Sequence, residues 1–293
     1  MITAASDPRE DYLVTLAALF GPFIENYTVV DVGAHGTGDA DVYAPLLAAK
    51  GAMVVGFEPD RLECARLNET WSGKRRFFPY AIADGAQAQF YACRAPLTSS
   101  LLRPNAELLA HFEGLAEMCE VTEEIAISTV RLDDIEEVAS ADFLKIDIQG
   151  GTLLALENAE RLLERALLVH AETEFLQIYR DQPLFSECER FLRQRHFMFH
   201  HFHNLEGRRM THGGYAVGRV PSQTLWADAV FVPSLQRLDQ LSDRELARLA
   251  WTTEVVYGAS DMAMACLLRC REAETAKLAA SFRSLLAAHG RLE

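Results

Sequence analysis

The feature that most constrains this chain is a short apolar run that leads directly into a glycine-rich segment. The run Val29-Val30-Asp31-Val32 continues as Gly33-Ala34-His35-Gly36-Thr37-Gly38. Its β-branched residues predict a buried strand over 27–32, and the glycines predict a tight turn in which the backbone can approach a ligand. A second apolar run, over 52–57, ends in Gly56-Phe57-Glu58. Together the two runs indicate an α/β protein with a ligand site at the carboxyl ends of its strands.

Apolar runs alternate with helical patterns along most of the chain, which predicts βαβ units. Further strands are expected over 76–82, 88–93, 124–130, 142–147, 167–171, 197–203 and 225–232, and helices over 8–24, 41–50, 60–70, 152–164 and 184–195. No helix separates the last two strands, so they are expected to form an antiparallel hairpin whose long 204–224 loop acts as a lid. The predicted fold is a doubly wound, mostly parallel seven-stranded sheet with an antiparallel edge strand, an N-terminal helix and a C-terminal helical appendage.

The character of the sequence changes after Pro233. Residues 236–293 contain no strand-like run, and their leucines recur at a spacing that predicts two or three helices. We therefore expect an N-terminal helical segment over 1–26, a Rossmann-like domain over 27–233 and a C-terminal helical extension over 234–293. The leucines of the extension need to be buried, either on the core or in a homodimer contact.

Composition excludes several classes of protein. A net charge of −14 disfavours a nucleic-acid surface, which needs clustered Lys and Arg. The uncharged stretch 12–24 is shorter than the roughly 20 apolar residues of a membrane span. The N-terminus lacks the basic head of a secretory leader, and the six cysteines form no CxxC pair. A cytoplasmic protein with buried free thiols is expected.

The residue types discriminate among nucleotide-like ligands. A dinucleotide fingerprint needs glycine where His35 stands, which disfavours a nicotinamide dehydrogenase, and no Gly-Lys-Ser/Thr follows as in a phosphate-binding loop. Asp31 would repel a pyrophosphate but can hold a positively charged amine, unless it only caps the turn. Glu58 can accept hydrogen bonds from two ribose hydroxyls. S-adenosylmethionine, which carries an amine and a sulfonium but no phosphate, fits this pattern.

Several sequence blocks follow one another in a recognisable order. They are Asp31-Val-Gly-Ala-His, Gly56-Phe-Glu-Pro-Asp, Thr98-Ser-Ser-Leu-Leu, Val130-Arg-Leu-Asp-Asp, Asp142-Phe-Leu-Lys-Ile-Asp-Ile-Gln-Gly, Glu174-Phe…Tyr179…Gln182-Pro-Leu-Phe and Trp226-Ala-Asp-Ala-Val-Phe. In these blocks the chain resembles the FkbM family of class I, Rossmann-like, S-adenosylmethionine-dependent methyltransferases. The resemblance covers residues 27–232, although the family usually has Asn at the position of His35 and Gly at that of Thr37.

The resemblance implies a set of cofactor-binding residues. Asp31 and Gly33, with His35 in the same loop, would border the methionyl part of the cofactor, and Glu58 the ribose. Ala83 and Asp84, at the end of the third strand, would border the adenine. For Asp84, a turn residue before Gly85 is an equal alternative.

Catalytic candidates follow the strands next to the first one. Asp147 ends the strand expected beside it and shares one side of that strand with Lys145, although the two residues would also suit a structural ion pair. His170, Glu172 and Glu174 alternate onto one face if their strand runs that far. An alcohol acceptor must lose a proton, which a carboxylate or His can take. The expected order as base is Asp147, Glu172, Glu174, His170, with a buried core histidine as the alternative for His170.

Other groups of residues are candidate metal-binding or ligand-binding sites. The histidines 196, 200, 201 and 203 suggest zinc, but closed zinc sites need four N or S ligands and no cysteine lies near, so a partly exposed edge strand without metal is expected. A divalent cation held by Asp147 and Glu172 is conceivable, but no spacing shows it. Ser99-Ser100 lies in a loop that the resemblance associates with substrate or cofactor, against plain turn chemistry.

Two functions of different class follow from the sequence. One is an S-adenosylmethionine-dependent methyltransferase that methylates an oxygen of a small hydroxylated or sugar-like acceptor. The other is a non-catalytic Rossmann-like binding or scaffold protein with the C-terminal helices as its interface, which the departures at His35 and Thr37 keep open. Binding of the cofactor discriminates between them.

Overall fold

The chain was analysed as a computed structural model that describes residues 8–34, 42–47, 52–70, 73–212, 215–216 and 218–292. The described residues divide into two compact units. The larger unit takes its residues from Val30–Thr37 and Val54–Ser234, and the smaller from Met1–Val29, Gly38–Met53 and Leu235–Glu293.

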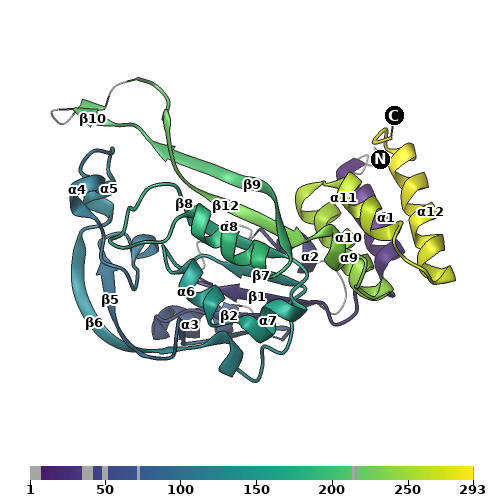
Figure 1. Cartoon of the computed structure of the whole chain (residues 1–293), viewed down its shortest axis with the longest axis horizontal. Helices are drawn as coiled ribbons and strands as arrows, with labels where there is room; N and C mark the ends of the chain where they lie inside the picture. Colours follow the sequence, from purple (N-terminus) through teal and green to yellow (C-terminus); the bar gives the residue numbers. More distant parts are fainter. Residues whose placement is uncertain are drawn as a thin grey trace, which may run out of the picture. The chain divides into compact units, whose positions relative to one another are not determined.

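A seven-stranded sheet organises the larger unit (Figure 1). Strands β2 and β3 are parallel, as are β7 and β8, whereas β12 is antiparallel to both of its neighbours, β8 and β9. The predicted α/β fold is therefore confirmed, with the antiparallel strand lying just inside the edge strand β9. The order across the sheet is β3 (Arg75–Phe78), β2 (Met53–Phe57), β1 (Thr28–Val32), β7 (Phe143–Ile146), β8 (Val169–Glu174), β12 (Gln223–Pro233) and β9 (Phe197–Arg208).

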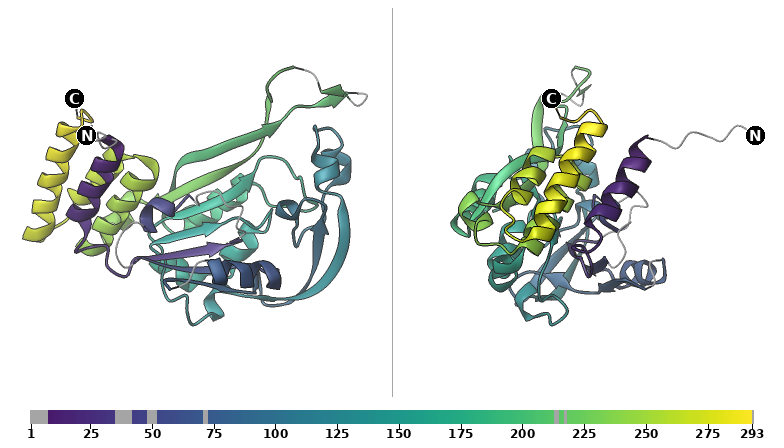
Figure 2. Two further views of the ribbon diagram at one scale, coloured as in Figure 1. Left: turned by 180° about the vertical axis from the view of Figure 1, so that it is seen from behind. Right: turned by 90° about the vertical axis from the view of Figure 1, so that its right-hand side faces the viewer.

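The two faces of the sheet differ in chemistry because side chains alternate along each strand. Val32, Ile146 and Ala171 contribute to a buried apolar cluster with residues of α6 (Thr152–Glu157), α7 (Glu160–Arg165) and α8 (Phe185–Gln194). Helix α3 (Arg61–Thr70) lies on the opposite side of the sheet, in front when the molecule is turned by 180° (Figure 2). Helices on both sides make the sheet doubly wound.

The face opposite the apolar cluster carries ionisable side chains. Lys145 pairs in register with His170, and Glu172 pairs with Asp228. Residues paired across neighbouring strands point to the same face, so one face holds a row of charged and polar groups. This row ends at the carboxyl ends of β7 and β8.

Two predicted elements are each divided in the structure. The strand expected over 76–82 is β3 followed by β4 (Ala81–Ile82), because Pro79 has no N–H to continue the ladder. Strand β4 pairs with β6 (Val121–Val130) in a separate three-stranded sheet that also contains β5 (Gln87–Cys93). The helix expected over 152–164 is interrupted between α6 and α7.

Most of the predicted 204–224 lid loop is strand. Strand β9 continues to Arg208 and β12 begins at Gln223, while β10 (Thr211–His212) and β11 (Tyr215–Ala216) form a short ribbon between them (Figure 1). Side chains hold this region to the turn after the short helix α4 (Ala106–Leu109), since Arg209 pairs with Glu113 at 2.5 Å. The expectation of a long lid loop is therefore wrong for this segment.

Helices make up the smaller unit. Tyr12 and Phe20 of α1 contact the C-terminal helices: the Tyr12 hydroxyl donates to Glu254 Oε1 at 2.8 Å, and the Phe20 ring lies 5.8 Å from Trp251 and 5.9 Å from Phe282. The helix predicted over 41–50 is seen as α2, and its residues 41 and 48–50 lie outside the described residues. The helices are α1 (Pro8–Phe20), α2 (Ala44–Leu47), α9 (Leu235–Leu238), α10 (Asp243–Tyr257), α11 (Ser260–Leu267) and α12 (Ala273–Ala288).

Candidate functional site

Gly33 lies where the ends of three strands meet. Its N–H donates to Phe57 O at 3.0 Å, and the N–H of Asp147 donates to Val32 O at 2.9 Å. Gly33 has φ +85°, and a Cβ at this position would lie 1.9 Å from the carbonyl oxygen of Asp147. Only glycine permits this backbone conformation and this close approach without strain. The sequence-predicted glycine turn thus brings the ends of β1, β2 and β7 together.

A partly buried lysine, Lys145, connects the two predicted aspartates. Asp31 is 1% exposed, and its Oδ1 lies 3.0 Å from Lys145 Nζ. The same Nζ lies 3.8 Å from Asp147 Oδ2, and the Asp147 side chain is 38% exposed. The Lys–Asp pair weighed from the sequence is therefore formed mainly with Asp31, and Asp147 remains accessible at the rim of this network.

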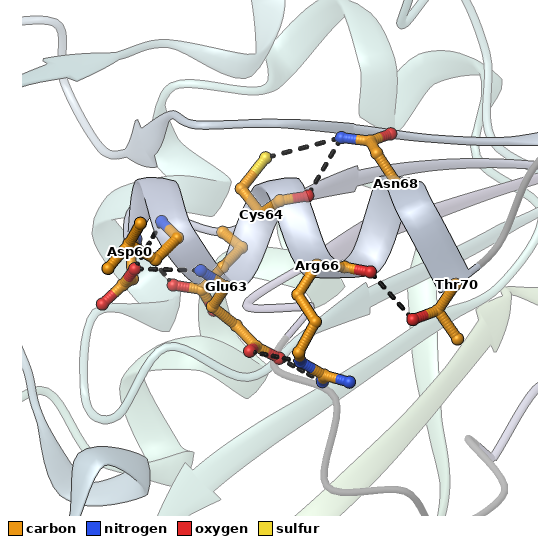
Figure 3. A network of polar contacts seen from close by, with 8 residues as sticks. Asp60, Glu63, Cys64, Arg66, Asn68 and Thr70 are labelled. Carbon is orange, nitrogen blue, oxygen red and sulfur yellow. Dashed lines mark hydrogen bonds and ion pairs between the residues drawn. The ribbon is translucent and has the colours of Figure 1, made fainter.

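Glu58 follows β2 and is held by the turn into α3. It is buried, and its Oε1 accepts a hydrogen bond from the N–H of Asp60 at 2.8 Å. Asp60 in turn caps the helix, because its Oδ1 accepts from the N–H groups of Leu62 and Glu63 at 2.7 and 3.0 Å (Figure 3). The Asn68 side chain, on the same helix, bonds to both the N–H and the carbonyl of Phe77. These contacts fix a carboxylate beside the Gly33 turn.

The structure corrects the placement of Ala83 and Asp84. They follow β4 in the three-stranded sheet, not the third strand of the main sheet. Asp84 Oδ1 accepts from the N–H of Ala86 at 3.0 Å and from the Thr129 hydroxyl at 3.3 Å, just beside Gly85 with φ +86°. These contacts are those of a turn residue. His35, predicted in the same set, lies outside the described residues.

Three carboxyl groups gather at the ends of β7 and β8. Strand β8 runs to Glu174, as the alternation argument required, so Glu172 and Glu174 share a face. Gln149 Nε2 donates to Glu172 Oε2 at 2.8 Å and to Asp147 Oδ1 at 3.2 Å. Glu172 and Glu174 are both buried, and the Oε1 atom of Glu174 accepts no hydrogen bond from any described residue.

Burial changes the acid strength of two of these groups. Burial, and then the charges of Asp147, Glu174 and Asp228, raise the pKa of Glu172 well above its usual range. Burial and the charge of Asp147 raise the pKa of Glu174 to about 8. Both groups are therefore weaker acids than an exposed glutamate and keep a proton to higher pH.

His170 occupies a deeper position than the other candidates. It is buried, its ring lies 5.9 Å from that of Phe143, and its Nε2 lies 3.4 Å from Asp228 Oδ2. Burial raises the pKa of Asp228, but the hydrogen bonds from His170 and Asn204 outweigh this effect and the pKa is lowered. The structure thus pairs His170 with Asp228 rather than with Asp147, as expected for a core histidine.

Sequence reasoning did not assign a role to three polar residues of the site. The Tyr179 hydroxyl lies 3.0 Å from Gln149 Oε1 and 2.9 Å from Thr98 O, and Gln182 Oε1 accepts from the N–H of Tyr179 at 3.1 Å. The loop residue Ser100 also reaches the site, because its hydroxyl donates to the carbonyl of Gln149 at 2.6 Å. All of them lie in blocks that carry the family resemblance, which is the signal that would have found them.

The histidines of β9 form contacts with one another. Nδ1 of His200 lies 2.6 Å from Nδ1 of His201, whose ring lies 6.4 Å from that of His203. Burial and these neighbours lower the pKa of His201 to about 4. Among the described residues, no three His, Cys, Asp or Glu side chains are grouped so that they could hold a metal ion.

A separate question is membrane insertion. Within the described part of the chain, no helix has both the length and the apolar character needed to cross a bilayer.

Comparison with solved structures finds weak likenesses. A protein of Thermoplasma acidophilum described as a methyltransferase has a TM-score of 0.36 and 10% identity, over 72% of this chain and 70% of that one. The precorrin-6y C5,15-methyltransferase of Geobacter metallireducens has a TM-score of 0.33 and 10% identity, over 79% and 94%. The M. jannaschii TYW2, solved in complex with AdoMet, has a TM-score of 0.28 and 14% identity, over 79% and 77%.

Comparison of the sequence with models of protein families identifies the family of the chain. No curated protein matches the chain. The family model of the methyltransferase FkbM domain matches residues 31–199, which is more than half of the chain and contains Asp31, Glu58, Asp147 and Glu174. The matched region also includes the end of β1 and all of β2, β7 and β8, the strands whose ends form the site. The chain belongs to the FkbM methyltransferase family.

Proposed function

We propose that this chain transfers a methyl group from S-adenosylmethionine to a hydroxyl group of a small hydroxylated or sugar-like acceptor. The observation that carries the proposal is the meeting of Gly33, Glu58 and Asp147 at the carboxyl ends of β1, β2 and β7 in a sheet of the FkbM family. Ligands of doubly wound sheets bind at this edge.

The residues at this edge suit an adenosyl ligand with an amino acid tail. Gly33 has no side chain, so a ligand can approach its backbone closely. The buried Glu58 carboxylate can accept hydrogen bonds from ribose hydroxyls. The acidic groups would repel phosphates, whereas an ammonium and a sulfonium are compatible with them. Asp31 already shares its charge with Lys145, so an amine would meet the Asp31–Lys145–Asp147 network rather than a lone carboxylate. When bound, S-adenosylmethionine supplies an activated methyl group.

A side chain of the protein would accept the proton that the acceptor hydroxyl loses. Asp147 is the most exposed of the candidate acids and adjoins Gly33 through the backbone. Its carboxylate is therefore placed to take the proton of an acceptor hydroxyl. The pKa values of Glu172 and Glu174 are raised, and His170 is paired with Asp228, so these residues follow Asp147 in the order of preference.

A transfer assay with isotope-labelled methyl groups tests the proposal. The full chain is incubated with S-adenosylmethionine and pairs of acceptors that differ only in a hydroxyl or an amine at one carbon. Mass spectrometry then locates the label. We expect O-methylated products together with S-adenosylhomocysteine. Exclusive N-methylation would overturn the oxygen assignment, and absence of both cofactor binding and turnover would favour the scaffold alternative.

A further inference from the structure

Gln149 has an unusual backbone conformation and lies between β7 and β8, the strands that carry the candidate acids. It has φ +52°, and the next residue, Gly150, has φ +84°. A left-handed conformation is unfavourable for a residue with a side chain, so other contacts must maintain it. The Ser100 hydroxyl provides one such contact, since it donates to the carbonyl of Gln149 at 2.6 Å. This turn directs the Gln149 side chain back over the strand ends.

The amide of Gln149 connects three polar side chains from three segments of the chain. Its Nε2 donates to Asp147 Oδ1 at 3.2 Å and to Glu172 Oε2 at 2.8 Å. Its Oε1 lies 3.0 Å from the Tyr179 hydroxyl. Tyr179 is itself buried and tied to the loop around Thr98. Asp147 and Glu172 therefore share one neutral donor, and the contact of Tyr179 with the amide oxygen fixes the orientation of that donor.

The charged surroundings of the two carboxyl groups differ. Lys145 faces Asp147 at 3.8 Å, and the Asp147 side chain is partly exposed to solvent. Glu172 is buried, and the groups that face it are acidic: Asp147 on β7, Glu174 on its own strand and Asp228 on β12, the last paired with His170. Among the described residues, the Gln149 amide bridges the pair, and a hydrogen bond between the Asp147 and Glu172 side chains also raises the pKa of Glu172.

We propose that Gln149 is a positioning residue: its amide orients Asp147, the carboxylate that takes the acceptor's proton, and connects it to the buried carboxyl group of Glu172. The inference rests on the proposed function for the identity of the acceptor. Because the amide nitrogen donates to Glu172 Oε2, it favours the ionised form of this buried acid and opposes the rise in pKa that burial causes. The proton of the acceptor hydroxyl passes to Asp147 and from there to solvent.

Nuclear magnetic resonance of the full chain tests this role without any substrate. Glutamine side chains are labelled with ¹⁵N, and the Gln149 amide signal is assigned by its loss in Gln149→Asn. We expect this signal to shift with pH in a step above the ordinary range of a glutamate, and the step to be absent in Glu172→Gln. The amide of Gln87, an exposed residue of β5 that contacts Ser128 on β6, serves as control and should not show the step.

A second measurement separates the side chain from the backbone turn. Asn tolerates the left-handed conformation better than Gln but is one methylene shorter. Gln149→Asn therefore retains the turn but no longer brings the amide to Asp147 and Glu172. A donor to the ionised form lowers the pKa of an acid, so its loss should move the ¹³C carboxyl titration of Glu172 to higher pH. A Glu172 titration that is unchanged in Gln149→Asn, or a Gln149 signal without the step, overturns the inference.

The outcome is separable from that of the proposed function. Neither titration requires S-adenosylmethionine, so a chain that fails to bind this cofactor but shows both shifts refutes the proposed function alone. Normal cofactor binding with flat titrations refutes the positioning role alone.

Discussion

Gly33 and Asp147 approach each other so closely that a methyl group on Gly33 would lie 1.9 Å from the carbonyl oxygen of Asp147. The residues are far apart in the sequence, and the contact joins the glycine turn after β1 to the end of β7. It places the accessible acid of the site directly beside the turn that the family resemblance assigns to the methionyl part of the cofactor.

Replacing Gly33 by Ala should destabilise the protein by at least about 2 kcal/mol, because left-handed strain and a backbone clash add. Gly114→Ala is the matched control, since Gly114 also has positive φ (+75°) but has no atom within 4 Å of its added Cβ. That variant should show the strain alone, about 1–2 kcal/mol. Urea denaturation measures both. Equal effects of the two substitutions would show that the close approach to Asp147 is not maintained.

Glu58→Ala should weaken S-adenosylmethionine binding by roughly 1.5–3 kcal/mol, because a charge-assisted acceptor for the ribose hydroxyls is lost. Calorimetric titration measures the change. Glu69→Ala is the control and should bind normally. Glu69 is exposed on α3, the helix that follows Glu58 and the Asp60 N–H that donates to it. Unchanged affinity in a folded Glu58→Ala protein would refute the ribose assignment.

Stability should fall as pH rises because of Glu174. Its pKa is raised from 4.5 to about 8 by burial and by Asp147, so within this window the folded chain holds a proton that the unfolded chain has released. The contribution is fully present below the unfolded value and is lost as pH rises through the folded one, with a slope of at most about 1.4 kcal/mol per pH unit. Glu172 contributes in the same direction.

Glu174→Gln should reduce this loss, since the amide is neutral at every pH. Urea denaturation at about pH 5 and about pH 8.5 gives the comparison, with the variant gaining on the wild type at the higher pH. A variant that loses stability with pH as steeply as the wild type would show that Glu174 is ionised in the folded chain.

Asp147→Asn should lower the rate of methyl transfer by about 100- to 10,000-fold and leave cofactor affinity nearly unchanged, as for loss of a general base. Release of S-adenosylhomocysteine with an acceptor from the transfer assay measures the rate. Asp261→Asn, at an exposed position of α11, controls for the change of charge. If alanine variants of Asp147, His170, Glu172 and Glu174 all turn over at near wild-type rates, the base set is ruled out and only proximity to the sulfonium remains.

Phe20→Ala should destabilise the smaller unit by about 3–5 kcal/mol, because the ring is fully buried against Trp251 and Phe282. Val14, on the same helix, is 66% exposed, and Val14→Ala should cost less than about 0.5 kcal/mol. Thermal unfolding followed by Trp fluorescence compares the variants. If Phe20→Ala unfolds like Val14→Ala, α1 does not pack on α10 and α12 as described.

Much of the sheet was predictable because strands such as β1 and β2 are short apolar runs with a turn beside them. The pattern around Val29–Val32 predicted both β1 and the glycine turn, and the alternation of His170, Glu172 and Glu174 predicted one face for all three. The division between β3 and β4 was also present in the sequence, since Pro79 lies within the predicted strand. The extent of β9 was missed because its last residues, such as Asn204 and Gly207, have low strand propensity and pair only through β12.

The site was less predictable because its contacts depend on tertiary pairing. The sequence presented Asp31 as a lone acid, whereas the structure places Lys145 beside it once β7 lies next to β1. Gln149 lies in a block that carries the family resemblance, but its role depends on a left-handed turn and on the hydroxyl of Tyr179, which the sequence does not show. Such relationships arise between segments and have no local pattern.

Binding of S-adenosylmethionine at the carboxyl ends of β1, β2 and β7 is tested most directly by calorimetric titration of the full chain. We predict saturable binding with one cofactor per chain, and a folded Glu58→Ala protein with affinity lower by roughly 1.5–3 kcal/mol. A folded wild-type chain that gives no heat and no saturation with S-adenosylmethionine would contradict the proposed methyl transfer and favour the scaffold alternative.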